Sequence, residues 1–234
     1  MKHLTTLSQA LLILFFTLSL SISGCSSDDK DDLSSITSTD EDGSTSVNLT
    51  TLIEVLETMP LETLSAAETD GLIFMREEEK LAYDVYNVLF AQWAEKVFDN
   101  IANSELTHTE AMLILLDRYS ITDPVGSNAA GVFVDVSLQG LYDTLVAQGS
   151  ASLIDALLVG TAIEEIDIID IQNLVDALEG NDDIELVYEN LMKGSRNHLR
   201  AFVRNLEGQG VIYQPQYLSQ DVYDAIINSD FEAG

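Results

Sequence analysis

The sequence contains few cysteines, few basic residues and few prolines. Its single cysteine, Cys25, excludes an internal disulfide and any metal site built from cysteine pairs. Only 10 Lys and Arg accompany 40 Asp and Glu, which gives a formal net charge of −30. This charge excludes nucleic acid as a partner, because too little would neutralise the phosphates. The three prolines, Pro60, Pro124 and Pro215, fall between predicted helices.

The first 24 residues have the features of an export signal. A short basic start is followed by an apolar run, Leu11–Leu20, that is too short to span a bilayer comfortably, and then by Ile22-Ser-Gly-Cys25. This ending resembles the bacterial lipobox, which implies cleavage before Cys25 and lipid attachment to its sulfur. We therefore expect an exported protein, lipid-anchored to the cell envelope at the outer membrane or the cell surface. The alternative is an ordinary signal peptide whose cleavage site holds a cysteine.

The remaining chain divides into a polar stretch and a helical domain. Residues 25–51 are predicted to form an acidic, Ser/Asp-rich flexible tether, because they carry too little apolar surface to offset the entropy of ordering. Residues 52–234 show apolar residues at helical spacing, and strand-like alternation is confined to Val132–Val136. The predicted helices are Leu52–Thr58, Ser65–Trp93, Val97–Tyr119, Leu138–Ala147, Ser152–Leu178 and Asp182–Gly208, and a tail over Tyr213–Phe231 is expected outside the bundle.

The four long helices each carry candidate metal ligands. In bundle-type dimetal carboxylate proteins, a Glu comes from each of two helices and a Glu-x-x-His pair from each of the other two. Glu105 and His108 are three residues apart, so they share a helix face and can hold one ion. On the first long helix we favour Glu79, because it shares a face with Tyr86, and we expect the two preceding glutamates to face solvent or to pair with basic neighbours. A small error in helical phase would exchange Glu78 for Glu79.

The third and fourth long helices complete the candidate set. Glu164 and Glu165 interrupt an apolar run, where carboxylates are costly unless they are paired or bound to metal. Glu164, three residues before Asp167, is the favoured ligand, with Glu165 on the solvent side; the alternative places both on a polar edge. The fourth helix offers His198, but Ser195 occupies the expected carboxylate position. A dimetal centre would therefore be one carboxylate short.

These motifs resemble a known superfamily. Glu79-Lys-Leu-Ala-Tyr-Asp-Val-Tyr86 and Ile101-Ala-Asn-Ser-Glu-Leu-Thr-His108 are similar to the rubrerythrin type of the ferritin-like superfamily. A narrower resemblance, over about Leu72–Leu206, is to the ferritin-like family of unknown function DUF2202. It implies an all-α, ferritin-like four-helix bundle with an additional short helix in the crossover connection, a C-terminal extension and a capacity for metal binding. It brings no settled activity. The narrower resemblance rests on Arg76-Glu-Glu-Glu-Lys-Leu-Ala, Asp117-Arg-Tyr, Asp123-Pro-Val, Leu138-Gln-Gly-Leu-Tyr-Asp-Thr-Leu-Val-Ala, Ile163-Glu-Glu-Ile-Asp-Ile and Gly194-Ser-Arg-Asn-His-Leu-Arg-Ala-Phe202.

Three functions fit this pattern. The first is an oxidoreductase that oxidises ferrous iron or reduces peroxide or oxygen. Its metal centre would be di-iron, mononuclear iron or manganese. Tyr86 would donate a hydrogen bond or an electron at its site, and another protein would donate electrons, since the chain has no cysteine pairs. The second is a lipoprotein that captures divalent metal ions without catalysis. The third is a metal-free structural bundle.

Two arginines near the expected site have two interpretations. Arg196 and Arg200 are one helical turn apart in a chain with few cations. They are expected either to pair with Glu164 or Asp167 in a buried salt bridge or to bind an anion. The sequence does not predict an oligomeric state.

Overall fold

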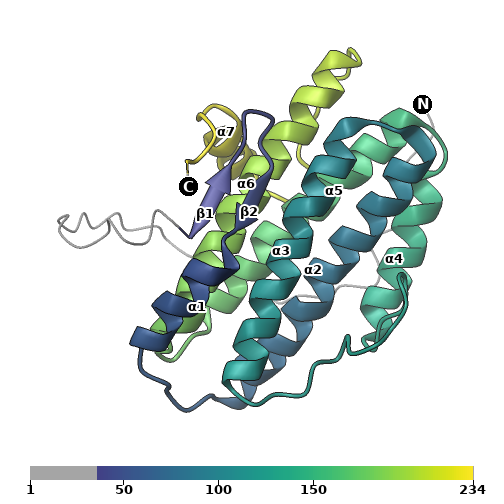
Figure 1. Cartoon of the computed structure of the whole chain (residues 1–234). Helices are drawn as coiled ribbons and strands as arrows, with labels where there is room; N and C mark the ends of the chain where they lie inside the picture. The colour runs from purple at the N-terminus through teal and green to yellow at the C-terminus, as the bar shows by residue number, and fades with distance from the viewer. Residues whose placement is uncertain (1–35, 234) are drawn as a thin grey trace. The chain divides into compact units, whose positions relative to one another are not determined.

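The computed structural model describes residues 36–233. The predicted export signal, Cys25 and the tether up to residue 35 lie outside the described residues. Four long helices run side by side to form the bundle (Figure 1). They are α2 (Ala66–Trp93), α3 (Lys96–Arg118), α5 (Leu153–Asp176) and α6 (Asp182–Gly208).

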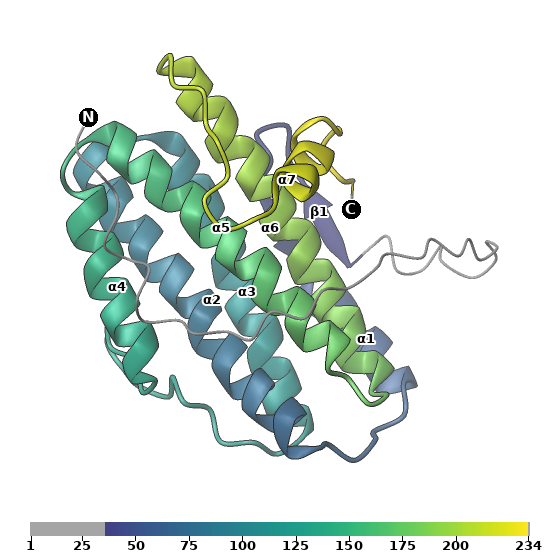
Figure 2. The same cartoon turned by 180° about the vertical axis from the view of Figure 1, so that it is seen from behind.

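The long helices pack as two pairs. α2 packs most extensively against α3, and α5 against α6, while α3–α6 and α2–α5 contacts join the pairs. α4 (Val136–Gly149) lies in the long connection between α3 and α5 and packs on α2 and α5. α7 (Gln220–Ile227) packs on α6, within the C-terminal segment that follows that helix (Figure 2). The prediction of an all-α bundle with a short crossover helix and a C-terminal extension is confirmed.

Local capping interactions fix where the helices begin. Ser65 accepts a hydrogen bond from the amide of Glu68, whose side chain accepts one from the amide of Ser65, so the predicted capping box is present. Ser152 accepts a hydrogen bond from the amide of Asp155 at the start of α5. At the other end of α2, Ala94 adopts a left-handed conformation with φ of 54°, which ends the helix before α3.

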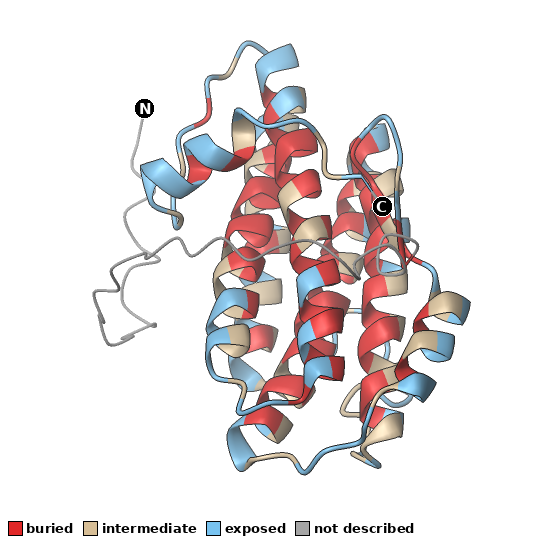
Figure 3. Ribbon diagram, turned by 90° about the vertical axis from the view of Figure 1, so that its left-hand side faces the viewer, coloured by how far each residue is buried: buried red, intermediate tan, exposed pale blue. Residues whose placement is uncertain are grey.

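The apolar core consists of two clusters separated along the helix axes. On α2 one cluster contains Leu72 and Met75, and the other contains Leu81 through Leu89. On α6 the division falls between Met192 and Leu199. Buried residues line the inward faces of the long helices, as Figure 3 shows in red. The residues that lie between the two clusters are polar, and they include the predicted metal ligands.

A β-hairpin precedes the bundle where the tether was predicted, so that prediction was wrong for residues 36–51. β1 (Thr37–Thr39) pairs antiparallel with β2 (Thr45–Val47), and α1 (Leu49–Thr58) follows. The segment has little apolar surface of its own. The hairpin buries Ile36 and Val47 in the core and contacts α3 and α6 through β2. Contacts with the bundle therefore supply the stability that its composition lacks.

The connection around Val132–Val136, where the sequence alternation is strand-like, does not form a strand. Its Phe133 is buried against Tyr142 of α4, with ring centroids 5.4 Å apart. Side-chain packing thus accounts for the apolar character of this stretch. Among the described residues, no helix has the length and apolarity needed to cross a membrane.

Candidate metal centre

A layer of buried polar side chains crosses the bundle between the two apolar clusters. The five predicted metal ligands belong to this layer, and each is at most 2% exposed. They come from all four long helices: Glu79 from α2, Glu105 and His108 from α3, Glu164 from α5 and His198 from α6. The structure therefore brings all five side chains together.

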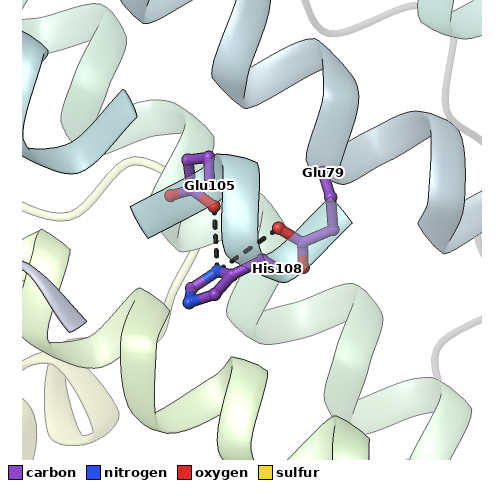
Figure 4. A group of neighbouring side chains, drawn as sticks. All are labelled: Glu79, Glu105 and His108. Atoms are coloured by element: carbon purple, nitrogen blue, oxygen red, sulfur yellow. Dashed lines mark ion pairs between the residues drawn. The ribbon is translucent and has the colours of Figure 1, made fainter. Parts of the chain in front are cut away.

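Glu79, Glu105 and His108 form the first group that could hold a metal ion. One ligand atom from each residue lies within 4.8 Å of the others. Nδ1 of His108 is 2.9 Å from Oε2 of Glu105 and 3.5 Å from Oε2 of Glu79, and Figure 4 shows both carboxylates directed at this ring. Two carboxylates and one imidazole are suitable ligands for iron, manganese or zinc.

Glu105, Glu164 and His198 form the second group, which shares Glu105 with the first. Nδ1 of His198 is 2.8 Å from Oε1 of Glu105 and 3.5 Å from Oε2 of Glu164. The rings of His108 and His198 stack with centroids 5.4 Å apart. Tyr86, which is fully buried, donates a hydrogen bond of 2.5 Å to Oε1 of Glu164. Tyr86 therefore lies beside the second group.

A carboxylate from α5 lies next to Ser195, the position at which α6 lacks one. Ser195 is buried and donates a hydrogen bond to Oδ2 of Asp167. Asp167 is also buried, and its other oxygen has no hydrogen-bond partner among the described residues. The layer thus retains an additional carboxylate next to the position where the fourth helix departs from the Glu-x-x-His pattern.

The electrostatics of the layer reflect closely spaced carboxylates that are buried from solvent. Burial raises the pKa of Glu79 to about 8, although His108 opposes the shift. Burial opposes charge on His198, but Glu105 and Glu164 outweigh it and raise its pKa to about 9. Burial also disfavours the charged form of Glu105, but the two histidines outweigh it and hold its pKa well below the usual range. The pKa values of adjacent groups in the layer are therefore shifted in opposite directions.

Unpartnered polar atoms test whether the residues fit a metal ion. Among the described residues, Oε1 of Glu79, Oδ1 of Asp167 and Nδ1 of both His108 and His198 are buried without a hydrogen-bond partner. The Nδ1 contacts with Glu105 are close ion pairs rather than aligned hydrogen bonds. Unpaired buried polar atoms are costly, so their concentration in one layer fits a cation that several of them would ligate.

Sequence reasoning missed Thr45, a hairpin residue that contacts both imidazoles. Its carbonyl oxygen lies 2.8 Å from Nε2 of His108, and its amide donates a 3.3 Å hydrogen bond to Nε2 of His198. Asn197 holds the same residue from α6 by donating a hydrogen bond of 2.9 Å to Oγ1 of Thr45. A backbone contact of this kind leaves no signal in residue type or spacing.

The expected solvent-facing positions of Glu78 and Glu165 were wrong. Glu78 is buried, and burial together with Asp170 and Asp167 raises its pKa well above the usual value. Glu165 is fully buried and accepts hydrogen bonds from the hydroxyl of Tyr213 and from backbone amides of residues 216–218. Glu165 therefore attaches the C-terminal segment to α5 and is directed away from the candidate metal ligands.

The expectation that Glu77 faces solvent or pairs with Arg76 or Lys80 was also wrong. Glu77 is buried and accepts hydrogen bonds from two backbone amides in the connection before α4. Arg76 pairs with Asp123 at 3.1 Å, and Lys80 pairs with Asp84. Arg76 therefore attaches the connection after α3 to α2. Lys80, whose ion pair lies within α2, also donates a hydrogen bond to the carbonyl of Ala129 in that connection. Neither is paired with the glutamate triplet as expected.

Arg196 and Arg200 do not pair with the polar layer as expected. Both contact Glu232 in the C-terminal segment, at 2.5 Å from Arg196 and 3.1 Å from Arg200. Arg200 also donates a hydrogen bond to the carbonyl oxygen of Ile226. The two arginines therefore bind the end of the chain to α6, so neither expected role, a salt bridge within the layer or anion binding, is supported.

The fold and the layer together define an all-α bundle protein with buried Glu and His groups that could hold a metal ion. The chain belongs to the uncharacterized protein domain family DUF2202, which matches residues 68–230. It is 48% identical over 183 residues to the uncharacterized protein MJ0754 of Methanocaldococcus jannaschii, covering 78% of this chain and 98% of the relative.

A crystal structure gives the same picture of the fold. The structure of the hypothetical protein MJ0754 from Methanococcus jannaschii DSM 2661 is similar, with a TM-score of 0.73 and 49% sequence identity. The similarity covers 74% of this chain and 99% of that one. Neither the family nor this relative has an assigned activity in its description, so the function is inferred from the site.

Proposed function

We propose that this protein binds iron or manganese in the polar layer and acts as an oxidoreductase that oxidises ferrous iron or reduces peroxide or oxygen. The candidates to hold the ion are the two groups that share Glu105. When bound, the ion would supply the electron-transfer chemistry. The chain's own residues would position it, exclude water and hold protons beside it.

The observation that carries the proposal is the set of unpartnered ligand atoms in a layer supplied by four helices. Imidazole and carboxylate atoms from distant parts of the chain lie within 4.8 Å of one another in each group. A purely structural ion-pair network would leave fewer acceptors unpaired, because each one costs about 1–3 kcal/mol. The mixed oxygen and nitrogen ligands favour iron or manganese over calcium or magnesium.

Burial limits the substrate to small species. The five ligands are at most 2% exposed, so ferrous ions, peroxide and oxygen fit the site better than an organic substrate does. Tyr86 holds its proton against Glu164, which places a proton donor beside the ligands. Because the chain has a single cysteine, electrons beyond those of ferrous iron would come from a protein donor.

The proposed location is the cell envelope. Lipid attachment at Cys25 would anchor the bundle through the acidic segment that follows it, and the charge of −30 would concentrate cations near the site. Replacing Cys25 by Ser and following membrane fractionation tests the anchor independently of metal binding. A variant that remains membrane-bound would refute lipidation at this residue.

Metal content of the full chain, purified without chelator or affinity tag, tests the metal site. We expect iron or manganese in the wild type and its loss in the Glu105→Ala, His108→Ala double variant. Glu189→Ala is the matched control, because Glu189 is exposed on α6. Ferrous oxidation and peroxide consumption are then measured on the loaded protein.

Each alternative function predicts a different result. Metal capture predicts reversible binding of several divalent ions without turnover. A metal-free structural bundle predicts no metal in either protein and an unfolding free energy that does not change with chelator. The second result would refute the proposed function altogether.

A further inference from the structure

The hairpin directs the backbone of one residue at both histidines of the metal centre. Thr45 pairs with Thr39 in the ladder, while its amide and carbonyl groups contact the rings of His198 and His108. Thr45 lies outside residues 68–230, so the family match assigns it no role. The amide can only donate a hydrogen bond and the carbonyl can only accept one, so the two contacts place opposite requirements on the two rings.

The contact with His108 leaves its Nδ1 available to a metal ion. The carbonyl oxygen of Thr45, 2.8 Å from Nε2 of His108, requires a proton on that nitrogen. A neutral imidazole carries one proton, so Nδ1 then has a free lone pair. A backbone carbonyl that fixes the tautomer of a ligating histidine is a common arrangement in metal sites. Nδ1 of His108 faces Glu105 and Glu79.

The contact with His198 has the opposite result. The amide of Thr45 donates to Nε2, so a neutral ring must carry its proton on Nδ1. A charged ring carries protons on both nitrogens and cannot accept this hydrogen bond. In either state Nδ1 of His198 holds a proton, and its nearest acceptor is Oε1 of Glu105 at 2.8 Å. This nitrogen therefore has no lone pair for a metal ion.

A neighbour of His198 also supplies a proton. Tyr86 donates to Oε1 of Glu164, and the other oxygen of that carboxylate lies 3.5 Å from Nδ1 of His198. In the first group, Oε1 of Glu79 has no partner among the described residues. The second group therefore has a hydroxyl donor beside it, while the first has an unpaired carboxylate oxygen.

We propose that Thr45 makes the two histidines inequivalent, so that the centre takes one divalent transition-metal ion on Glu79, Glu105 and His108. His198 stays outside its coordination and presents an N–H group to Glu105. This inference rests on the proposed metal-binding function and sets the number of bound metal ions at one. It makes Thr45 a positioning residue.

The test compares equivalent changes at the two rings in the full chain loaded with Zn²⁺. His108→Asn removes the ligand, and we expect affinity to fall at least about 100-fold. His198→Asn keeps an N–H donor near Glu105, and we expect one ion to remain bound with less than about a 10-fold loss. Two ions in the wild type, with one lost in His198→Asn, would overturn the inference and leave the metal-binding function intact.

Nitrogen-15 NMR of the imidazoles reports the tautomers directly, with the two Asn variants assigning the signals. We expect Nδ1 of His198 to carry a proton with and without Zn²⁺, and Nδ1 of His108 to carry none in the Zn²⁺ form. An unprotonated Nδ1 on His198 in either form refutes the role of Thr45. If no variant or wild type binds metal, the proposed function fails, and a metal-free spectrum above pH 9, where the ring is neutral, still decides the His198 assignment.

A substitution at Thr45 isolates the amide. Thr45→Pro removes the N–H that contacts His198 but keeps the carbonyl that contacts His108. Thr45→Ala is the matched control, because it removes Oγ1 and keeps the N–H. We expect the proline variant to free Nε2 of His198, to shift its proton from Nδ1 and to allow a second ion to bind, whereas the alanine variant still binds one. The same tautomer in both variants would contradict the proposal.

Discussion

Gly194→Ala should weaken metal binding, although Gly→Ala within a helix usually stabilises a protein. A Cβ at residue 194 would lie 2.5 Å from Cε1 and 2.8 Å from Nε2 of His108. Carbon atoms in contact are separated by about 3.5 Å, so the ring must move by about 1 Å. The ring cannot move freely, because it is fully buried, stacks on His198 and contacts Thr45.

The magnitude follows from two opposing contributions. Overpacking costs about 1–3 kcal/mol, and the higher helix propensity of Ala returns about 1 kcal/mol. The unfolding free energy should therefore change between about zero and a loss of 2 kcal/mol. Metal ligands tolerate displacements of only about 0.2 Å, so affinity for Zn²⁺ should fall by about 10–100-fold.

The matched control is Gly140→Ala. Gly140 is an exposed helical glycine in α4, and a Cβ there would meet nothing within 4 Å. This variant should gain up to about 1 kcal/mol and keep wild-type affinity. Urea unfolding and calorimetric Zn²⁺ titration measure both quantities. Wild-type affinity and a gain in stability for Gly194→Ala would refute the packing of His108 against α6.

Two further predictions concern protons and the chain end. The unfolding free energy of the metal-free protein should fall as pH rises from about 5 to 9. Burial raises the pKa of Glu79 to about 8, and neighbouring carboxylates, against the effect of burial, raise the pKa of His198 to about 9, so the folded state binds more protons than the unfolded state. Urea unfolding over this pH range checks the prediction, and a free energy that rises with pH would contradict it. Glu165→Gln should lower the unfolding free energy by roughly 1–3 kcal/mol and expose the C-terminal segment to proteolysis, because it weakens the acceptor of several backbone amides. Glu189→Gln, on the exposed surface of α6, should change neither the unfolding free energy nor the rate of proteolysis.

The sequence predicted that the candidate ligands lie close together, and the structure groups them so. Glu-x-x-His spacing fixes two of them, Glu105 and His108, on one helix face. The prediction failed on Glu77 and Glu78 because helical periodicity assumes a single buried face. Every residue from Met75 to Ala82 is buried, so α2 is enclosed on all sides there and periodicity carries no information. The three adjacent glutamates face different surroundings. Glu77 faces the connection before α4, Glu78 the carboxylates of α5, and Glu79 the polar layer with its candidate ligands.

Contacts of its individual residues account for the Gly-Ser-Arg-Asn-His stretch of α6, which stands where a second Glu-x-x-His pair was expected. Gly194 leaves room for the ring of His108, and Ser195 holds a carboxylate supplied by α5. Arg196 binds the C-terminal segment, Asn197 holds the hairpin, and His198 receives the hairpin's amide. Each residue therefore has a separate contact, and two of them attach the hairpin that contacts both rings. A glutamate in place of Ser195 would add a carboxylate to the layer, but it would remove the hydroxyl that donates to Asp167.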